Sequence, residues 1–200
     1  MEVLKAIYTR RAIRNFADTM VTSDVLLPLL HAAVQAPSGL NQQPWAFAVY
    51  QGRHKLHEYS QEAKQVFLSN TAATVQETSG AAEMLNDPHF DIFYNANTLV
   101  VILAKPMGLN PADDCFLAAQ NFMLAAHSQG LGTCPIGFAR PWFNLPQTKR
   151  RLDIPIEMTV VFPLIIGYPQ ETPDAPPRNE PEIVAWDVSR LDQLRAPAAV

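Results

Sequence analysis

A group of three arginines near the start of the chain has the residue types to bind an anion. Arg10 and Arg14 are four residues apart, so on a helix they would share one face, while Arg11 would point elsewhere. The planar guanidinium of arginine can give a phosphate two parallel, charge-assisted hydrogen bonds. A solvated basic helix end is the plainer interpretation of the same residues, because cations are favourable near a helix C-terminus.

A polar segment further along, residues 36–45, has the composition of a binding loop. It reads Ala-Pro-Ser-Gly-Leu-Asn-Gln-Gln-Pro-Trp, and its prolines prevent a helix from continuing through it. The hydroxyl of Ser38 and the amides of Asn41 and Gln43 can both donate and accept hydrogen bonds, next to backbone that Gly39 leaves open. An ordinary proline or Asx turn is the alternative for this segment taken alone.

Together the two segments favour a ligand that is anionic, partly aromatic and rich in hydrogen-bonding groups. Flavin mononucleotide (FMN) fits this description, because its phosphate suits the arginines and the edge of its pyrimidine ring suits the amides. A Gly-rich stretch at 130–138 follows the longest predicted helix but lacks the G-x-G-x-x-G spacing of a dinucleotide-binding fold. We interpret that stretch as a helix end and a turn.

The elements that must position these residues follow from the apolar pattern. It predicts a helix beginning near residue 3, helices at 23–36, within 61–85 and at 113–129, and strands at 46–50, 97–104 and 159–167. The continuous apolar run at 97–104 indicates a central strand buried on both faces. Pro163 implies an edge, a bulge or an interrupted ladder in the last strand, and Pro28 lies near the start of the second helix.

The helix at 113–129 is apolar around most of its circumference, so it should be a core helix with little surface facing water. Trp142 and Phe143, in an aromatic turn after Arg140, suit either core packing or the lining of a substrate pocket. From about residue 168 the chain is rich in proline, which excludes a regular helix or central strand. We expect this segment to wrap over a surface, and residues 1–200 to form one domain.

Composition and charge exclude several classes of protein. The chain has 200 residues, 48% of them apolar, which suffices for one sizeable core, although a partner subunit could complete it. The net charge of −4 argues against broad attraction to nucleic acid or to an anionic membrane. The first residues lack the layout of a secretory signal, and no run is long enough to span a bilayer. We expect a cytoplasmic protein that binds neither nucleic acid nor membrane.

The cysteines and histidines do not indicate a metal or disulfide site. Cys115 and Cys134 are too few for a disulfide scaffold and belong to no Cys-x-x-Cys pair, so we expect both to be buried packing residues. His54 and His57 lie three apart beside Glu58, but this order matches neither common zinc-protease motif. We therefore expect no bound metal.

Taken in order, these motifs resemble those of the nitroreductase family of FMN-dependent oxidoreductases. The resemblance rests on Arg-Arg-x-x-Arg-x-Phe, Ala-Pro-Ser-x-x-Asn-x-Gln-Pro-Trp, Gly-Leu-Gly-Thr and Gly-Tyr-Pro, followed by the proline-rich tail with Arg178. It runs from the first helix to the tail, although residues 53–93 contribute little. It implies an α+β fold with a central, mostly antiparallel sheet flanked by helices, in an intertwined homodimer with two FMN sites at the interface.

The resemblance also implies which residues bind the cofactor. Those expected at the phosphate, ribityl chain or pyrimidine side are Arg10, Arg11 and Arg14, with Arg178 as a further phosphate cation. Those expected from the other subunit, at the ring or ribityl chain, are Pro37, Ser38, Gly39, Asn41 and Gln43. Those expected along the ring near its reactive nitrogen are Pro135, Ile136 and Gly137. Ala12 stands where family members often carry Ser, which removes a hydroxyl contact but leaves the arginine charges in place.

The implied activity is transfer of reducing equivalents from NADH or NADPH to a nitroaromatic, a quinone or a related small-molecule acceptor by a ping-pong mechanism. The cofactor carries this chemistry, so no catalytic side chain is required, and Arg14 is the candidate cation that favours the anionic reduced ring. A flavin-binding protein of the same fold with a role such as flavin storage or fragmentation is the alternative. A cofactor-free hydrolase or interaction domain finds no support, because no Gly-x-Ser-x-Gly motif is present. The acceptor and the preferred nicotinamide cofactor stay open.

Overall fold

The computed structural model describes residues 1–71 and 81–186. The α-helices are α1 (Val3–Thr9), α2 (Ser23–Ala33), α3 (Arg53–Thr71), α4 (Ala81–Asn86), α5 (Pro111–Ser128), α6 (Arg140–Phe143) and α7 (Pro146–Arg151), with short 3-10 helices η1 (Gly39–Asn41) and η3 (Gly137–Ala139). The strands are β1 (Trp45–Gln51), β2 (Thr98–Ala104), β3 (Gly132–Pro135) and β4 (Thr159–Gly167). They form one sheet in the order β1-β2-β4-β3 with every neighbouring pair antiparallel, which confirms the expected α+β class.

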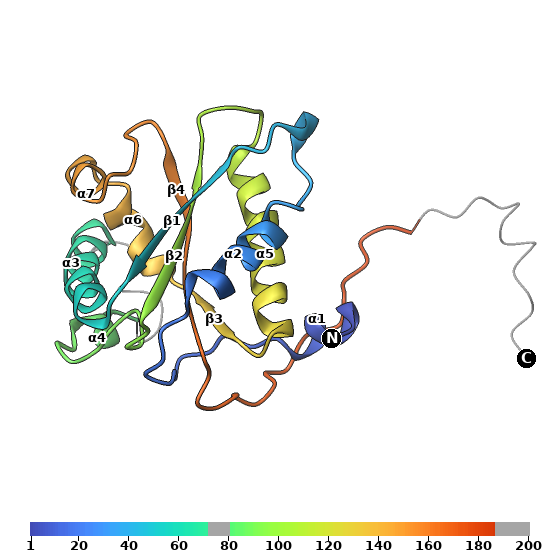
Figure 1. The fold of residues 1–200 in the computed structure, drawn as a ribbon, viewed down its shortest axis with the longest axis horizontal. Coiled ribbons are helices and arrows are strands. Elements are labelled where there is room, and N and C mark those ends of the chain that lie inside the picture. Colours follow the sequence, from blue (N-terminus) through green and yellow to red (C-terminus); the bar gives the residue numbers. More distant parts are fainter. Residues whose placement is uncertain (72–80, 187–200) are drawn as a thin grey trace, which may run out of the picture.

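Helices cover both faces of this sheet (Figure 1). α2 and α5 lie on one side, and α3, α4, α6 and α7 lie on the other. Alternate residues of β2 supply the two layers, because successive side chains of a strand point to opposite faces. Leu99 and Val101 pack in the cluster on the α3 side, whereas Val100 and Ile102 pack with Phe122 on the α5 side. β2 is buried along its whole length, as its continuous apolar run predicts.

The segment that carries the first arginines is extended rather than helical. α1 ends one residue before Arg10, whose φ and ψ are −60° and 135°. Ala12 forms a parallel bridge with Thr133, and the N–H of Ile13 donates to the carbonyl of Thr133 at 3.0 Å. The helical prediction was therefore wrong here, because contacts with β3 override local preference. In an extended chain Arg10 and Arg14 still lie on the same side.

Other local features depart from the expected pattern. β3 occupies part of the Gly-rich stretch that we interpreted as a turn, and it pairs with the end of β4. Pro28 is the sixth of 11 residues in α2 rather than one of the first, and the helix persists around it. Pro163 pairs with Val101 of β2, while on the other side of β4 the ladder with β3 ends one residue away at Leu164, so the proline stands where that ladder is interrupted. A register shift between Ile102 and Leu103 of β2 lies nearby, which agrees with the predicted bulge.

Two helical regions differ from their predicted extent. α3 begins at Arg53, eight residues before the helical signal at Gln61, and residues 72–80 of that predicted region lie outside the described part of the chain. α5 matches its predicted range and buries six side chains, but Phe116 and Leu117 are 40% and 47% exposed. The expectation that little of α5 faces water is therefore wrong for a single chain.

The described part of the proline-rich segment forms no helix or strand, as predicted; it passes near Arg10 and Arg11, and its end then runs away from the body of the molecule (Figure 1). Its beginning is tied down, because the N–H of Ala17 donates to the carbonyl of Tyr168 at 2.8 Å. Residues 170–186 are exposed. No helix in the described ranges is both long enough and apolar enough to cross a membrane.

Candidate functional site

The predicted arginines meet at one cavity, which we call the anion cavity. It has a volume of about 310 Å³ and is lined by Arg10, Arg11, Arg14 and Arg178 together with Asp174 and neighbouring small residues. Burial, followed by the charges of Arg178 and Arg11, lowers the pKa of Arg10. Positive charges held this close repel one another, so an anion in the cavity would stabilise the arrangement.

A second cavity, which we call the apolar cavity, lies on another side of Arg14. It has a volume of about 500 Å³ and is lined by Arg14, Phe67, Ile92, Tyr94, Phe138 and residues 134–137. The last of these include the predicted ring contacts Pro135, Ile136 and Gly137. Pro135 and Gly137 are exposed, whereas Ile136 is buried in the core. The cavity therefore offers backbone and apolar side chains to a flat ring.

Arg14 joins the two cavities because it lines both of them. Its guanidinium carbon lies 5.7 Å from the centre of the Tyr94 ring, a cation–π distance. The same two residues also line a third cavity of about 480 Å³, the polar cavity, together with Asp18, Arg53 and Asp91 among others. A ligand with an anionic end and a flat ring could thus fill the anion and apolar cavities with Arg14 between its two parts.

The predicted loop Pro37–Gln43 lies far from these cavities within the same chain. The N–H of Gly39 donates to the carboxylate of Asp114 at 3.3 Å, at the start of α5. Thr9, next to the arginines, contacts the ring of His127 at 2.8 Å. This residue lies near the end of α5, beside which α1 lies in Figure 1. Asp114 and His127 are 13 residues apart, which in an α-helix is about 20 Å. One chain therefore does not bring the loop to the arginines.

The loop nevertheless has a defined shape that presents its polar side chains. Leu40, Asn41 and Gln43 have positive φ values of 51°, 54° and 49°. The hydroxyl of Ser38 accepts the N–H of Gln43 at 3.0 Å, and the side-chain amide of Gln43 donates to Asn41 Oδ1 at 3.1 Å. Left-handed backbone in such residues is costly and persists where neighbouring contacts fix it. The side chains of Asn41 and Gln43 are exposed and can contact another molecule.

Several polar or aromatic residues have packing roles instead. Cys134 is 2% exposed, and burial raises the pKa of its thiol against the opposing effects of Arg14 and Arg10. Trp142 and Phe143 are buried in α6, and the indole N–H of Trp142 donates to Glu62 at 3.1 Å. Across residues 1–71 and 81–186, no His, Cys, Asp or Glu side chains gather in a group of three that could hold a metal.

Sequence reasoning missed the side chains that enclose the apolar cavity. Phe67 and Ile92 fall in the segment 53–93, which carries little family pattern, and Phe138 ends the Gly-rich stretch. Tyr94 is followed by Asn-Ala-Asn, and asparagine tolerates left-handed backbone, so an irregular turn before β2 was the available signal.

Comparisons with known proteins agree with this architecture. A solved structure described as a nitroreductase with bound FMN from Bacteroides fragilis superposes with a TM-score of 0.76 at 25% identity, covering 94% of this chain and 100% of that one. A protein of Archaeoglobus fulgidus, provisionally named NADH dehydrogenase/NAD(P)H nitroreductase, is 30% identical over 178 residues, which are 86% of this chain and 88% of that protein.

A further relative is an FMN reductase [NAD(P)H] of Bacillus subtilis, which is 28% identical over 200 residues, covering 96% of this chain and 76% of that protein. The model of the nitroreductase family matches residues 7–168. This match begins in the last turn of α1 and includes the first arginines, the loop, the Gly-rich stretch and the end of β4. The chain belongs to the nitroreductase family.

Proposed function

We propose that this chain binds FMN between two copies of itself and passes reducing equivalents from NADH or NADPH to a small-molecule acceptor such as a nitroaromatic or a quinone. The observation that carries the proposal is the position of Arg14, which borders both the anion cavity and the apolar cavity. FMN has the matching form, since a phosphate and a flat ring stand at opposite ends of one molecule.

The residues present fit the phosphate end of FMN. Arg10, Arg11 and Arg178 surround the anion cavity, and the lowered pKa of Arg10 reflects burial among like charges. A phosphate accepts bidentate hydrogen bonds from guanidinium groups, each contributing about 1.5 to 3 kcal/mol. Ala12 lines the same cavity, so the hydroxyl that the family often places there is replaced by a methyl group.

The ring end of the site is assigned to the apolar cavity. The backbone at Pro135–Gly137 would lie along the ring, and Phe67 and Phe138 would limit the access of water. When bound, FMN supplies the redox chemistry, accepting electrons from NAD(P)H and yielding them to the acceptor in turn, a ping-pong order. The part played by Arg14 is electrostatic, because its fixed positive charge stabilises the negative charge that reduction places on the ring.

A second copy of the chain would complete the site. Its loop Pro37–Gln43 would supply the hydroxyl and amide groups that one chain keeps about 20 Å away along α5. Apolar side chains available for such an interface lie on α1 and α5, namely Val3, Leu4, Ile7, Tyr8, Phe116 and Leu117, which are 40–74% exposed. An exposed apolar surface of this kind is typical of an interaction site. We assign it to a homodimer.

The remaining parts of the proposal concern the chain as a whole. Residues 1–200 form one domain, and the segment from about 168 wraps over the second copy. Its described end carries Ile183, Val184 and Trp186, which are 58%, 91% and 76% exposed and need an apolar partner surface. A cytoplasmic location suits a reductase that draws on NAD(P)H. Since the chain's net charge is −4, its local cations serve a small ligand rather than nucleic acid.

An absorbance spectrum of the purified protein, followed by anaerobic titration with NADH and with NADPH, tests this function. We expect flavin absorbance that is bleached by at least one of the two and restored by a nitroaromatic or quinone. Flavin absorbance that neither nucleotide bleaches would favour flavin storage or fragmentation instead. A colourless protein that does not take up added FMN would refute the proposal.

A further inference from the structure

A polar stripe on α3 holds an irregular segment, residues 87–97, that borders the apolar and polar cavities. Arg53 donates from Nε to the carbonyl of Asn95 at 3.0 Å, and the hydroxyl of Ser60 accepts the N–H of Ile92 at 3.0 Å. Lys64 donates from Nζ to two further carbonyls of the segment, at 2.9 and 2.7 Å. Positions 53, 60 and 64 share one face of a helix, so a single side of α3 makes all these bonds.

The hydrogen bonds of Lys64 require a charged group to be buried, which simple packing would not. Lys64 is only 4% exposed, and burial lowers the pKa of its ammonium group. A buried ammonium group is unfavourable unless its hydrogen bonds are satisfied. The hydrogen bonds of Lys64 go to the backbone of residues 87 and 90. The α3 stripe, meaning Arg53, Ser60 and Lys64, therefore stabilises one backbone course for this segment.

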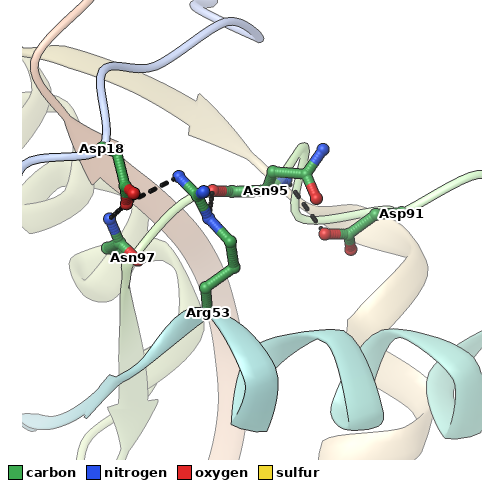
Figure 2. Close-up of polar contacts among 5 residues, drawn as sticks. All are labelled: Asp18, Arg53, Asp91, Asn95 and Asn97. Carbon is green, nitrogen blue, oxygen red and sulfur yellow. Dashed lines mark hydrogen bonds and ion pairs between the residues drawn. The ribbon is translucent and has the colours of Figure 1, made fainter.

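Two aspartates also hold the segment in place: Asp91, which belongs to it, and Asp18, which comes from the N-terminal part of the chain (Figure 2). The carboxylate of Asp91 accepts the N–H of Asn95, which Figure 2 shows, and also the N–H of Phe93, both at 2.9 Å. Asp18 lies 3.0 Å from the guanidinium of Arg53, and it accepts the side-chain amide of Asn97 at 3.0 Å.

This network holds two consecutive residues in left-handed backbone. The φ values of Tyr94 and Asn95 are 51° and 55°. For a tyrosine this conformation is unfavourable, and it persists only where the surrounding contacts fix it. Such strain clusters at functional sites. Here it places the Tyr94 ring at the boundary between the apolar and polar cavities.

The ring in turn holds Arg14. Phe90 packs edge-on against the Tyr94 ring with 5.6 Å between centres, and the guanidinium of Arg14 lies 5.7 Å from the centre of the same ring. A cation over the face of an aromatic ring is attracted by the negative charge density of that face. Burial raises the pKa of the Tyr94 phenol, more than the charge of Arg14 lowers it, so the ring stays neutral at pH 7. The neutral phenol adds no charge beside Arg14.

We propose that Tyr94 is a positioning residue that fixes Arg14 beside the ring of the cofactor, and that the α3 stripe acts through Tyr94. This inference rests on the proposed function, in which the charge of Arg14 stabilises the reduced ring. Two contacts of Tyr94 carry the effect, its aromatic face and its hydroxyl, which forms a hydrogen bond with Arg14. Loss of both contacts leaves Arg14 free to turn towards the polar cavity and its carboxylates, Asp18 and Asp91.

The midpoint potential of bound FMN tests the proposal, because a merely structural role would not move it. The comparison is made at the potential where FMN in the unaltered protein is half reduced. There we expect the ratio of reduced to oxidised FMN in Tyr94→Leu to be about fivefold lower, which corresponds to a midpoint potential lower by ~20 mV for a two-electron couple. Tyr94→Phe keeps the aromatic face but loses the hydrogen bond to Arg14, so the ratio should fall less than in Tyr94→Leu. Tyr59→Leu is the matched control, since Arg151 lies over the Tyr59 ring at the same 5.7 Å, and its potential should also be unchanged.

A double-mutant cycle tests the route of the effect. Tyr94→Leu should shift the potential in the unaltered background but not when combined with Arg14→Gln, because the cation through which it acts is then gone. Arg53→Gln removes the contact to Asn95 from a side chain that is 40% exposed, so it should fold normally and lower the ratio two- to threefold. In a Tyr94→Leu background Arg53→Gln should add nothing.

The possible outcomes separate this inference from the proposed function. If the unaltered protein fails to bind FMN, the function itself is refuted. If it binds FMN but Tyr94→Leu leaves the potential unchanged, or if the effects of Tyr94→Leu and Arg14→Gln are additive, the positioning role is overturned and the function stands. Should Tyr94→Leu not fold, a shift in Arg53→Gln supports the inference and an unchanged potential in that variant overturns it.

Discussion

Replacing Arg10 by alanine separates the role of the anion cavity from that of the ring site. Arg10 is half-buried beside Arg178 and Arg11, and its pKa is lowered by burial and by these two charges. Arg10→Ala should therefore relieve repulsion in the protein without cofactor, and its melting temperature in that form should not fall. With FMN bound, Arg10→Ala should instead lower the melting temperature, because the phosphate loses a bidentate partner.

The size of the effect follows from the interaction that is lost. Charged hydrogen bonds contribute about 1.5 to 3 kcal/mol, and taking about 2 kcal/mol for Arg10→Ala raises the Kd of FMN roughly 30-fold. At an FMN concentration of 100 times the unaltered Kd, binding stabilises the protein by about 2.7 kcal/mol, and in the variant by about 0.9 kcal/mol. For a chain of this size these values correspond to Tm increases of roughly 5–11 °C and 2–4 °C.

Riboflavin, which lacks the phosphate, is the matched ligand control. Its Kd should be nearly the same in Arg10→Ala and in the unaltered protein, whereas the Kd of FMN should differ between them. Arg150→Ala removes an exposed cation on α7 and should change neither affinity. Arg53→Ala, at the polar cavity, should weaken FMN binding less than Arg10→Ala does. Equal weakening for FMN and riboflavin would refute the assignment of Arg10 to the phosphate.

Three further outcomes are expected. Mixing equal amounts of chains that carry Arg10→Ala and chains that carry Asn41→Ala should restore tight FMN binding at about a quarter of the sites, because about half of the dimers are then mixed and each mixed dimer has one intact site of its two; titration of FMN fluorescence measures this, and no recovery would contradict a site shared between subunits. Tyr8→Asp places a charge on the exposed face of α1 and should halve the mass measured by analytical ultracentrifugation, while an unaltered protein that is already monomeric would count against the dimer. Gly132→Ala would bring a Cβ within 2.6 Å of Ile13 and should destabilise the fold by about 1 to 3 kcal/mol in urea unfolding, so an unchanged midpoint would contradict the close packing of β3 on this segment.

The parts of the fold that the sequence predicted are those dominated by burial. The apolar run of β2 has one favourable location, the middle of the sheet, and the long apolar pattern of α5 requires a packed helix. The grouping of the arginines was also visible in the sequence, because guanidinium groups close together suit an anion, although a solvated helix end explained the same residues. Arg178 joins the other arginines only because of the path that the proline-rich segment takes, and composition alone does not determine that path.

The parts that sequence reasoning missed depend on contacts between distant residues. The segment after α1 is extended because Ile13 bonds to Thr133, and neither residue reveals the other in the sequence. The α3 stripe was invisible because Arg53, Ser60 and Lys64 look like ordinary solvated positions on a helix. Their partners are backbone atoms of an irregular segment, which carry no side-chain pattern. The left-handed backbone of Tyr94 follows from those bonds.

The separation of loop and arginines along α5 couples cofactor binding to assembly. In the proposed function a lone chain offers FMN only part of its contacts, so affinity must fall when the protein is diluted below its dimer dissociation constant. By linkage, FMN must strengthen the dimer by the same factor by which the dimer strengthens FMN binding. Sedimentation of the protein across a dilution series, with saturating FMN and without it, gives the two dimer dissociation constants, and their ratio is this factor. Dissociation at the same concentration in the two series would show that each chain holds its cofactor alone, and the loop of the second copy would then lose its role.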